Sequence, residues 1–170
     1  YGGVLSLCSI GFDVFVLESI VSLLNGRTVI LPDEGEQENP SALASLIRNY
    51  AVGVLAITPS RLKAYMNHPE FMQALKRIES VICGGEHLSG ELIQRLKYSC
   101  GAEVYNQYGP SEATIGVSYQ RMNEASSITI GKPMPNCRLY VLDPHFQPLP
   151  IGVYGDLYVG GLCVGKGYRN

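Results

Sequence analysis

The sequence predicts an α/β fold, in which a parallel β-sheet flanked by helices is followed by part of a small, β-barrel-like subdomain. Helix-period and strand-like segments alternate through about residue 118, and this alternation is typical of βαβ units. In the last 50 residues, glycine- and proline-rich turns separate short strand-like runs, and no helical pattern appears. The hydrophobic content of 46% in 170 residues is enough for a sizeable core.

The first elements are a helix, a strand, a second helix and a second strand. Apolar residues repeat at helical spacing from Val14 to Leu24, Asn25-Gly26 supplies a stop, and a β-rich run covers 27–31. Asn39 and Pro40 suit an N-cap and a first helical residue. An apolar stripe follows, and Val52–Ile57 reads as a short strand. The stripe consists of Leu43, Leu46, Ile47 and Tyr50.

Three more helices and two more strands complete this region. Helices are expected from Pro59 through Met66 and from Pro69 through Leu75. The run Ser80–Cys83 is strand-like and ends in two glycines, and Ser89 caps a helix that carries Leu92, Ile93 and Leu96. The next expected strand is Glu103–Tyr105.

We expect two units, a Rossmann-like α/β subdomain over 1–118 and the start of a small β-subdomain over 119–170. Ten of the 19 glycines and six of the 10 prolines lie after residue 100. Short strands are expected there at 128–130, 138–142 and 156–159. Tyr1 and Asn170 indicate a piece of a longer protein, because the chain opens without a start Met and ends within a glycine-punctuated run.

Composition argues against several classes of protein. The 13 basic and 15 acidic residues give a net charge of −2, so a nucleic-acid or anionic-membrane binder is not expected. Acidic and serine residues interrupt the longest apolar stretch, 12–24, which is shorter than the roughly 20 apolar residues of a membrane span. The five cysteines are widely spaced and form no CxxC pattern, so we expect a reduced, cytoplasmic protein without a zinc site or disulfide framework.

The segment Tyr105–Thr114 is the most informative in the chain. It follows a predicted strand and therefore lies at a carboxyl edge, where open α/β sheets bind ligands. Tyr108 can stack on a base, Asn106 can pair with a base edge, and Gly109-Pro110 makes a tight turn. Ser111 offers a hydroxyl to phosphate and Glu112 a carboxylate to Mg²⁺. The alternative is a polar loop without a ligand.

Two other features point to the same edge. Gly84-Gly85-Glu86 follows a strand and precedes a helix, so its bare backbone could form the other wall of a base slot, although a simple turn is the plainer alternative. Asp13 opens an otherwise apolar helix, either as a carboxylate at the helix N-terminus or as a counter-charge for a substrate ammonium.

Other motifs are excluded. The C-terminal glycines, from Gly155 to Gly167, match neither GxxxxGK[ST] nor a dinucleotide fingerprint, and we interpret them as β-turns. The histidines lack a partner at a recognisable spacing, and Ser111 lacks the GxSxG context of a nucleophile.

Taken together, these segments resemble an adenylation domain of a nonribosomal peptide synthetase, in the adenylate-forming superfamily. Residues 12–18 are similar to the family's FDxSxxE segment, 105–112 to its NxYGPTE loop and 155–168 to its GELxIxGxGxxxGY segment. The resemblance covers essentially the whole chain. Phe15 stands where the family usually has Ser, Ser111 where it has Thr, Asp156 where it has Glu and Lys166 where it has Arg.

The resemblance implies a two-step reaction, in which an amino acid and ATP form an aminoacyl adenylate and the acyl group passes to a phosphopantetheine thiol on a carrier domain. It implies ATP and Mg²⁺ as cofactors, carrier and condensation domains as partners, and an adenine slot between Tyr108 and Gly84-Gly85-Glu86, with Asn106 at the adenine amino group and Gly109 in the turn. Ser111 would contact phosphate, Glu112 would ligate Mg²⁺ and Asp13 would hold the α-ammonium. The side-chain pocket would be lined by Val14, Leu17, Ala56, Ile82, Gly84, Gln107, Ile115 and Gly116.

The resemblance also implies that parts of the catalytic apparatus lie outside this chain. The family's phosphate loop would precede Tyr1, and its ribose-binding Asp and catalytic Lys would follow Asn170, so the 170 residues alone are expected to be inactive. Two alternatives stay open. One is a D-alanine–carrier-protein ligase or acyl-CoA ligase of the same superfamily, and the other is a non-catalytic nucleotide-binding module.

Overall fold

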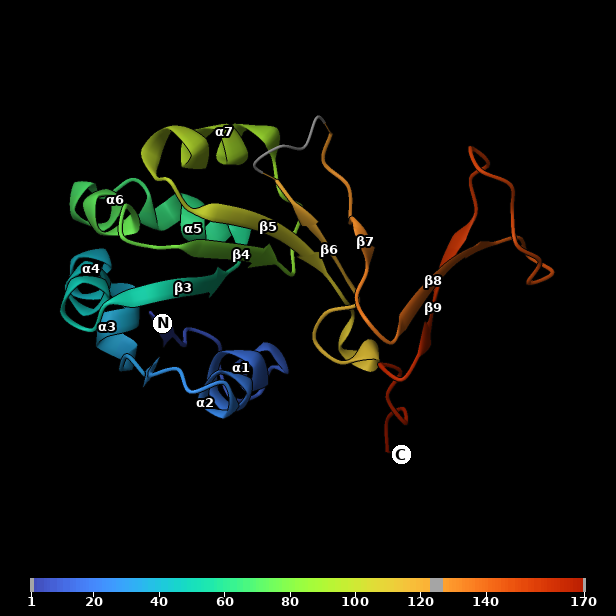
Figure 1. The fold of residues 1–170 in the computed structure, drawn as a ribbon, viewed down its shortest axis with the longest axis horizontal. Helices are drawn as coiled ribbons and strands as arrows, with labels where there is room; N and C mark the ends of the chain where they lie inside the picture. The colour runs from blue at the N-terminus through green and yellow to red at the C-terminus, as the bar shows by residue number, and fades with distance from the viewer. Residues whose placement is uncertain (1, 123–126, 170) are drawn as a thin grey trace.

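The computed structural model describes residues 2–122 and 127–169, which form two sheets (Figure 1). The larger sheet has seven strands in the order β2-β1-β3-β4-β5-β6-β7. Neighbours from β2 to β5 pair in parallel, whereas β6 and β7 pair antiparallel. Its strands are β1 (Gly3–Leu5), β2 (Val29–Ile30), β3 (Val52–Ile57), β4 (Ser80–Gly84), β5 (Glu103–Tyr108), β6 (Ser118–Arg121) and β7 (Lys132–Pro133). The second sheet pairs β8 (Cys137–Leu142) antiparallel with β9 (Asp156–Gly161).

Helices connect the parallel strands, and several begin at residues that favour a helix start. Asn39 accepts hydrogen bonds from the amides of Ser41 and Ala42, and Ser89 accepts one from Leu92, which satisfies amides that have no partner within the helix. The helical elements are α1 (Val14–Val16), η1 (Leu17–Val21), α2 (Ser22–Leu24), α3 (Glu34–Glu38), α4 (Pro40–Asn49), α5 (Pro59–Tyr65), α6 (Pro69–Leu75), α7 (Gly90–Ser99) and the 3₁₀ turn η2 (Ser111–Ala113).

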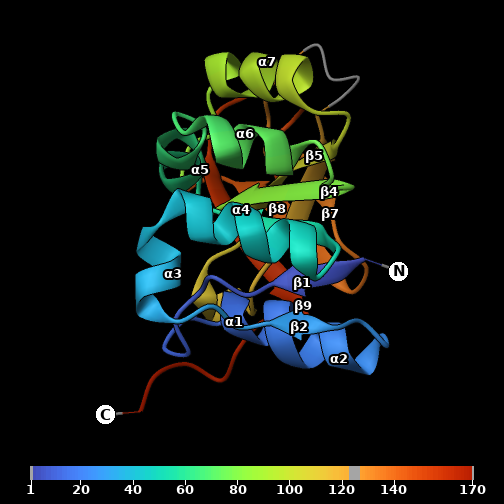
Figure 2. The same cartoon turned by 90° about the vertical axis from the view of Figure 1, so that its left-hand side faces the viewer.

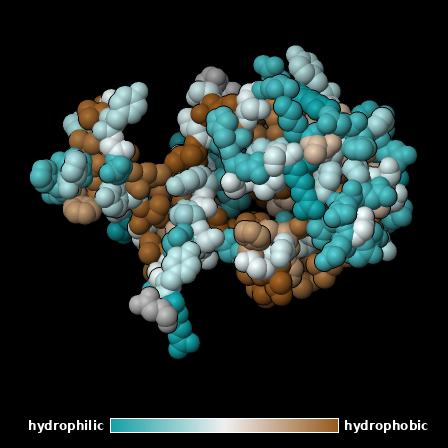
Figure 3. Space-filling model, turned by 180° about the vertical axis from the view of Figure 1, so that it is seen from behind, coloured by the Kyte–Doolittle hydropathy of each residue, from teal (hydrophilic) through white to brown (hydrophobic). Residues whose placement is uncertain are grey.

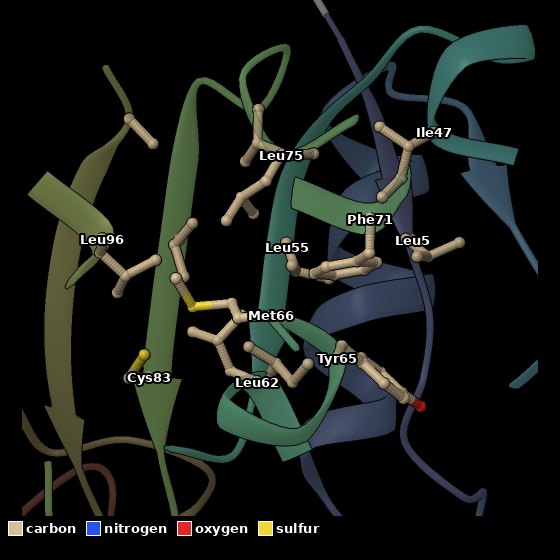
Figure 4. Packing of buried hydrophobic residues seen from close by; sticks show 14 of the residues in the cluster. Leu5, Ile47, Leu55, Leu62, Tyr65, Met66, Phe71, Leu75, Cys83 and Leu96 are labelled. Carbon is tan, nitrogen blue, oxygen red and sulfur yellow. The ribbon is translucent and has the colours of Figure 1, made fainter. Parts of the chain in front are cut away.

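The hydrophobic core lies between one face of the sheet and α4–α7 (Figures 2 and 4). Successive strand residues point to opposite faces, and Leu55 and Val81 are fully buried on this face. Phe71 of α6 and Leu96 of α7 are fully buried against them. This packed layer fixes the carboxyl ends of β3, β4 and β5 relative to one another.

The opposite face of the sheet is covered by one continuous helical segment, α1–η1–α2. Its middle is a π-helical turn, and Ser22 Oγ donates a hydrogen bond to the Leu17 carbonyl at 2.9 Å. The outer side of the segment is apolar and exposed, as is much of the β8–β9 hairpin (Figure 3). The exposed apolar residues of this outer side are Val16, Ile20, Leu23 and Leu24.

The structure corrects three expectations. The sheet is mixed, because the antiparallel strands β6 and β7 extend it past β5. Residues 128–130 form no strand, since side chains take the place of a strand partner: Asn106 Nδ2 donates to the Thr129 carbonyl at 2.7 Å, and the Thr129 amide donates to Gln120 Oε1 at 2.7 Å. Among the described residues after 133, one two-stranded antiparallel sheet stands where part of a β-barrel was expected.

The predicted division between residues 118 and 119 falls within β6, and where the two subdomains divide stays a prediction. Within 2–122 and 127–169, no helix is long and apolar enough to cross a membrane. Tyr1 and Asn170, on which the expectation of a longer protein rests, lie outside the described residues.

Candidate functional site

The pairing of β3, β4 and β5 arranges the predicted pocket residues in rows across the sheet. Ala56 pairs with Ile82, and Ile82 with Tyr105, in a middle row. Gly84 pairs with Gln107 in a row at the carboxyl end. Val54 pairs with Ser80 in a row at the amino end. Because alternate residues share a face, all three rows face α1–η1–α2.

Asp13 reaches from the start of this helical segment to a loop 102 residues away. Its Oδ2 accepts a hydrogen bond from the Ile115 amide at 3.0 Å, and it makes no side-chain cap of its own helix. Thr114 and Ile115 have φ angles of 61° and 66°, which are strained for β-branched residues. The contact brings the predicted ammonium-binding residue next to predicted pocket residue Ile115.

The Gly84-Gly85-Glu86 turn is held in place by Ser60 at the start of α5. One Glu86 carboxylate oxygen accepts from the Ser60 hydroxyl at 2.7 Å and the other from the Ser60 amide at 2.9 Å. These two hydrogen bonds lower the pKa of the exposed Glu86 below its usual range. Gly85 has a φ of 80°, a conformation that suits glycine.

The predicted adenine-binding residues lie on the next strand, β5. Tyr108 ends this strand and is 36% exposed, so part of its ring is open to a ligand. Asn106 is buried, and its side-chain amide donates to the Thr129 carbonyl. This hydrogen bond uses one of the two N–H donors, and the side-chain carbonyl oxygen of Asn106 can accept from an exocyclic amine.

Ser111 and Glu112 form the exposed turn η2, which the C-terminal segment supports. The Gly165 amide donates to the Glu112 carbonyl at 2.7 Å, and Thr114 Oγ1 donates to the Cys163 carbonyl at 2.8 Å. The Tyr168 hydroxyl donates to Glu112 Oε1 at 3.1 Å, and this hydrogen bond raises the pKa of Tyr168. No sequence signal identified 163–168 as a support for this turn.

Two glycines shape the loop around Gln107. A Cβ at Gly116 would overlap the side-chain amide of Gln107, so Gly116 makes room for that side chain. A Cβ at Gly109 would lie 2.5 Å from the Ile115 carbonyl oxygen and 2.6 Å from the Gly116 Cα. The two glycines therefore let β5 and the following loop approach closely.

A cavity of about 550 Å³ lies between α1–η1–α2 and the sheet face. A volume of this size is in the range of small-molecule sites. Leu17, Ala56 and Ile82, which were predicted to line the substrate pocket, line this cavity. Its other apolar walls are Val4, Val21 and Val54, and Ser80, Tyr105, Asn25 and Arg27 contribute polar groups.

Glu18 is a buried carboxylate on the cavity wall that was not predicted as a site residue. It is 2% exposed and accepts hydrogen bonds from Ser6 Oγ at 3.0 Å and the Cys8 amide at 2.9 Å. Burial raises the pKa of Glu18, although these hydrogen bonds oppose the shift. Both donors lie in the chain just after β1, so Glu18 ties the helical segment to the sheet.

The structure brings several of the predicted pocket residues together on the face of the sheet that α1–η1–α2 covers, in its middle row and at its carboxyl end. A hydrogen bond joins Asp13 to Ile115, and strand pairing joins Gly84 to Gln107 and Ala56 to Ile82. Val14 lies one residue after Asp13 and is half-buried. The supporting contacts of Ser60 and Thr129 were missed, because each depends on tertiary pairing without a local motif.

The described residues contain no cluster of three or more His, Cys, Asp or Glu side chains that could hold a metal ion by themselves. Glu112 is exposed and offers one carboxylate at the same edge. Such a donor suits Mg²⁺ held together with substrate phosphates and water, a common arrangement for this ion.

Comparison with known proteins identifies a family. The model of the AMP-binding enzyme family matches residues 3–169. The chain is 38% identical over 172 aligned residues to a PKS-NRPS hybrid synthetase of Aspergillus niger, covering 98% of this chain and 9% of the relative. It is 35% identical to tyrocidine synthase 2 of Brevibacillus parabrevis, covering 98% of this chain and 5% of the relative. The chain thus spans less than a tenth of these relatives.

Solved structures share the fold. A crystal structure of a four-domain nonribosomal peptide synthetase bound to AMP and glycine superposes with a TM-score of 0.89 at 29% identity, covering 98% of this chain and 12% of that one. The Klebsiella oxytoca NpsA N-terminal subdomain superposes with a TM-score of 0.84 at 22% identity, covering 99% of this chain and 42% of that one.

Proposed function

The chain belongs to the AMP-binding enzyme family, and from this premise we propose that it supplies the amino-acid pocket and adenine slot of an adenylation domain in a longer, cytoplasmic synthetase. The activity is formation of an aminoacyl adenylate from an α-amino acid and ATP. Transfer of the acyl group to a phosphopantetheine thiol on a carrier domain follows, as part of an assembly line that also contains condensation domains. The similarity to the Brevibacillus and Aspergillus synthetases supports this reading.

The observation that carries the proposal is the position of Asp13. Its carboxylate lies at the carboxyl edge of the sheet and uses Oδ2 for the Ile115 amide. A carboxylate accepts several hydrogen bonds, so Oδ1 can bind an α-ammonium group while Oδ2 holds the loop. The ammonium would then lie one helical turn from Leu17, on the cavity wall.

The nucleotide would occupy the neighbouring part of the edge. Tyr108 stacks on adenine opposite Gly84-Gly85, and the Asn106 carbonyl oxygen accepts from the adenine amino group. Ser111 donates to phosphate. Glu112 would hold Mg²⁺, which offsets the negative charge that develops on the phosphates during adenylyl transfer.

The test is ATP–pyrophosphate exchange by the full-length protein that contains these residues, across a panel of amino acids and matched acids without an amino group. Asp13→Asn retains an oxygen for the Ile115 amide but removes the negative charge, so we expect KM for amino acids to rise at least tenfold with the fold intact. Glu112→Gln is expected to lower kcat by about 10²–10³.

The outcomes separate the alternatives. Preference for acids without an amino group, or an unchanged KM in Asp13→Asn, would support an acyl ligase of the same superfamily and refute the amino-acid reading. Nucleotide binding without exchange for any acid would support a non-catalytic module. Asp33→Asn is the matched control, because this carboxylate caps α3 away from the site.

A further inference from the structure

Two of the five free cysteines, Cys137 and Cys163, lie next to each other at one end of the β8–β9 hairpin. Cys137 is the first residue of β8 and pairs with Gly161, the last residue of β9. The chain turns back directly after Gly161, where the Val164 amide donates to the Gly161 carbonyl at 3.4 Å, and Cys163 lies within this turn. The hairpin therefore brings together two cysteines that are distant in the sequence.

The side chains of the two cysteines are in contact. A hydrogen bond joins the thiols of Cys137 and Cys163, and Cys163 Sγ also donates to the Gly160 carbonyl at 3.5 Å. Gly160 belongs to β9, so this second contact holds the Cys163 sulfur against the hairpin. A Cβ at Gly161 would lie 2.1 Å from the Asn136 carbonyl oxygen and 3.3 Å from the Cys137 Cα. The strands thus approach closely where the thiols meet.

We propose that Cys137 and Cys163 form an oxidation site, at which a peroxide converts the two thiols into a reversible disulfide that fastens the C-terminal segment to the hairpin. In a reducing compartment, such disulfides are usually transient and serve redox sensing or catalysis. Neither an amino acid nor a nucleotide takes part in the reaction, so the site goes beyond the proposed function and does not depend on it.

The reaction balances with hydrogen peroxide as the oxidant. The Cys163 thiolate attacks one peroxide oxygen, the O–O bond breaks, and the hydroxide that leaves takes up a proton to become water. The Cys137 sulfur then attacks the sulfenic acid at Cys163, so that the S–S bond forms, the S–O bond breaks and a second water leaves. The two thiols lose two electrons and two protons, and peroxide is reduced to water.

The environment of Cys137 sets the order of these steps. Burial raises the pKa of Cys137, and the hydrogen bond and charge of Cys163 raise it further. Because the thiolate is the nucleophile, Cys137 is the thiol that reacts second. Both thiols are half-buried, and hydrogen peroxide is small enough to need little open surface around them.

The fold favours this disulfide over other pairings of the cysteines. Closing the loop between two distant cysteines costs entropy in a flexible chain, but pairing of β8 with β9 has already closed the loop between Cys137 and Cys163. The second step is therefore an intramolecular reaction between groups in contact, for which effective concentrations are high. We expect this pair to form a disulfide on the order of tenfold faster, or more, than other pairs.

The disulfide would also strengthen the support of η2. The Cys163 carbonyl accepts from Thr114 Oγ1, and the Gly165 amide donates to the Glu112 carbonyl, so the C-terminal segment passes beside the turn (Figure 1). A covalent bond from Cys163 to β8 makes separation of this segment from the hairpin rarer. The Ala113 amide, which bonds within the turn, should then exchange more slowly by about threefold or more.

The experiment treats the full-length protein that contains these residues with hydrogen peroxide, blocks the remaining thiols with iodoacetamide in urea, and maps disulfides by mass spectrometry of a non-reduced digest. We expect the Cys137–Cys163 disulfide to accumulate first and dithiothreitol to remove it. Hydrogen exchange of the peptide that carries Ala113 is measured before and after. In protein unfolded in urea before peroxide is added, the preference for this pair should be lost.

Serine variants separate the disulfide from the fold. Cys137→Ser and Cys163→Ser each keep a hydroxyl that can donate and accept, and each should abolish the disulfide and the effect of peroxide on the Ala113 peptide. In Cys137→Ser, dimedone should trap the sulfenic acid at Cys163. Cys100→Ser is the matched control and should leave the disulfide unchanged, because Cys100 is also half-buried and its thiol donates to the Leu96 carbonyl at 3.4 Å.

Each result decides one part of the proposal. Peroxide that leaves Cys137 and Cys163 as thiols, or that links other pairs equally fast, overturns the oxidation site. No dimedone adduct at Cys163 in Cys137→Ser overturns the order of the two steps. Exchange of the Ala113 peptide that is unchanged or faster in the disulfide form overturns the effect on η2. ATP–pyrophosphate exchange tests the proposed function separately, so failure of one leaves the other standing.

Discussion

Replacing Asp13 with alanine tests whether its carboxylate holds the strained loop at Thr114 and Ile115. Positive φ at these two residues costs on the order of 1 kcal/mol or more at each. The Asp13 Oδ2 acceptor lies 3.0 Å from the Ile115 amide, and a hydrogen bond to a charged group contributes about 1.5–3 kcal/mol. The carboxylate therefore offsets much of the strain.

We expect Asp13→Ala to lower the protection of the Ile115 amide against hydrogen exchange by about 10- to 150-fold, since each 1.36 kcal/mol corresponds to a factor of ten. Residue-resolved exchange by NMR measures it, with the core amide of Leu55 as the internal reference. Asp33→Ala is the control, because it removes a similar 2.7 Å bond to the Glu36 amide far from the loop. Unchanged Ile115 protection in Asp13→Ala would refute the reasoning.

Three further predictions concern stability and reactivity. Gly109→Ala should destabilise the chain by about 1–3 kcal/mol, because the added Cβ would meet backbone atoms. Gly116→Ala should cost about 0.5 kcal/mol or less, because the side chain of Gln107 can move away. Urea unfolding measures both free energies, and equal costs for the two variants would contradict this prediction. Burial raises the pKa of Glu18, so the folded chain retains a proton that the unfolded chain releases, and this group's contribution to stability falls as pH rises above about 4.5. Glu18→Gln should therefore reduce the fall in Tm as pH rises above about 4.5. If Tm falls equally with pH in the variant and in the unchanged protein, the effect does not come from Glu18. Burial also raises the pKa of Cys83 to about 12. Iodoacetamide should therefore alkylate Cys83 more slowly than the four partly exposed cysteines, and mass spectrometry of the alkylated protein measures these rates.

The elements that the sequence predicted well carry local signals. Helix α4 has an Asn39 cap, a proline at its first position and an apolar stripe, and it forms as expected over Pro40–Asn49. Strand β3 coincides with the apolar run Val52–Ile57. Local propensity and burial agree in both elements, so no distant partner was needed to identify them.

The elements that were missed depend on distant partners or are very short. Strand β1 has three residues, and β6 carries the mixed sequence Ser-Tyr-Gln-Arg, which is ordered by pairing with β5. Helix α3 had a readable signal, since Asp33 and Glu36 form a capping box. The strand expected at 128–130 does not form, because the backbone amide and carbonyl of Thr129 bond to the side chains of Gln120 and Asn106 and not to a neighbouring strand.

The candidate site likewise contains residues that local sequence patterns identify and contacts that depend on distant partners. The residue types at the sheet edge were readable because each follows a strand or opens a helix. The pairing of Asp13 with Ile115 spans 102 residues, and that of Glu86 with Ser60 spans 26, so no local pattern specifies them. The cavity-lining residues Val54 and Ser80 were also missed, because strand register brings them side by side and no local motif marks either one.

The attachment of η2 to the C-terminal segment has a consequence for the order of folding. The Thr114–Cys163 contact closes a loop of 49 residues, at an entropic cost of about 3.5 kcal/mol for a flexible chain. Pairing of β8 with β9 shortens that path, because it brings Cys137 to Gly161. We therefore expect the hairpin to form before the turn that carries Ser111 and Glu112 becomes ordered. In a nascent chain, the turn that carries Ser111 and Glu112 would then become ordered only after residues 163–168 had been synthesised.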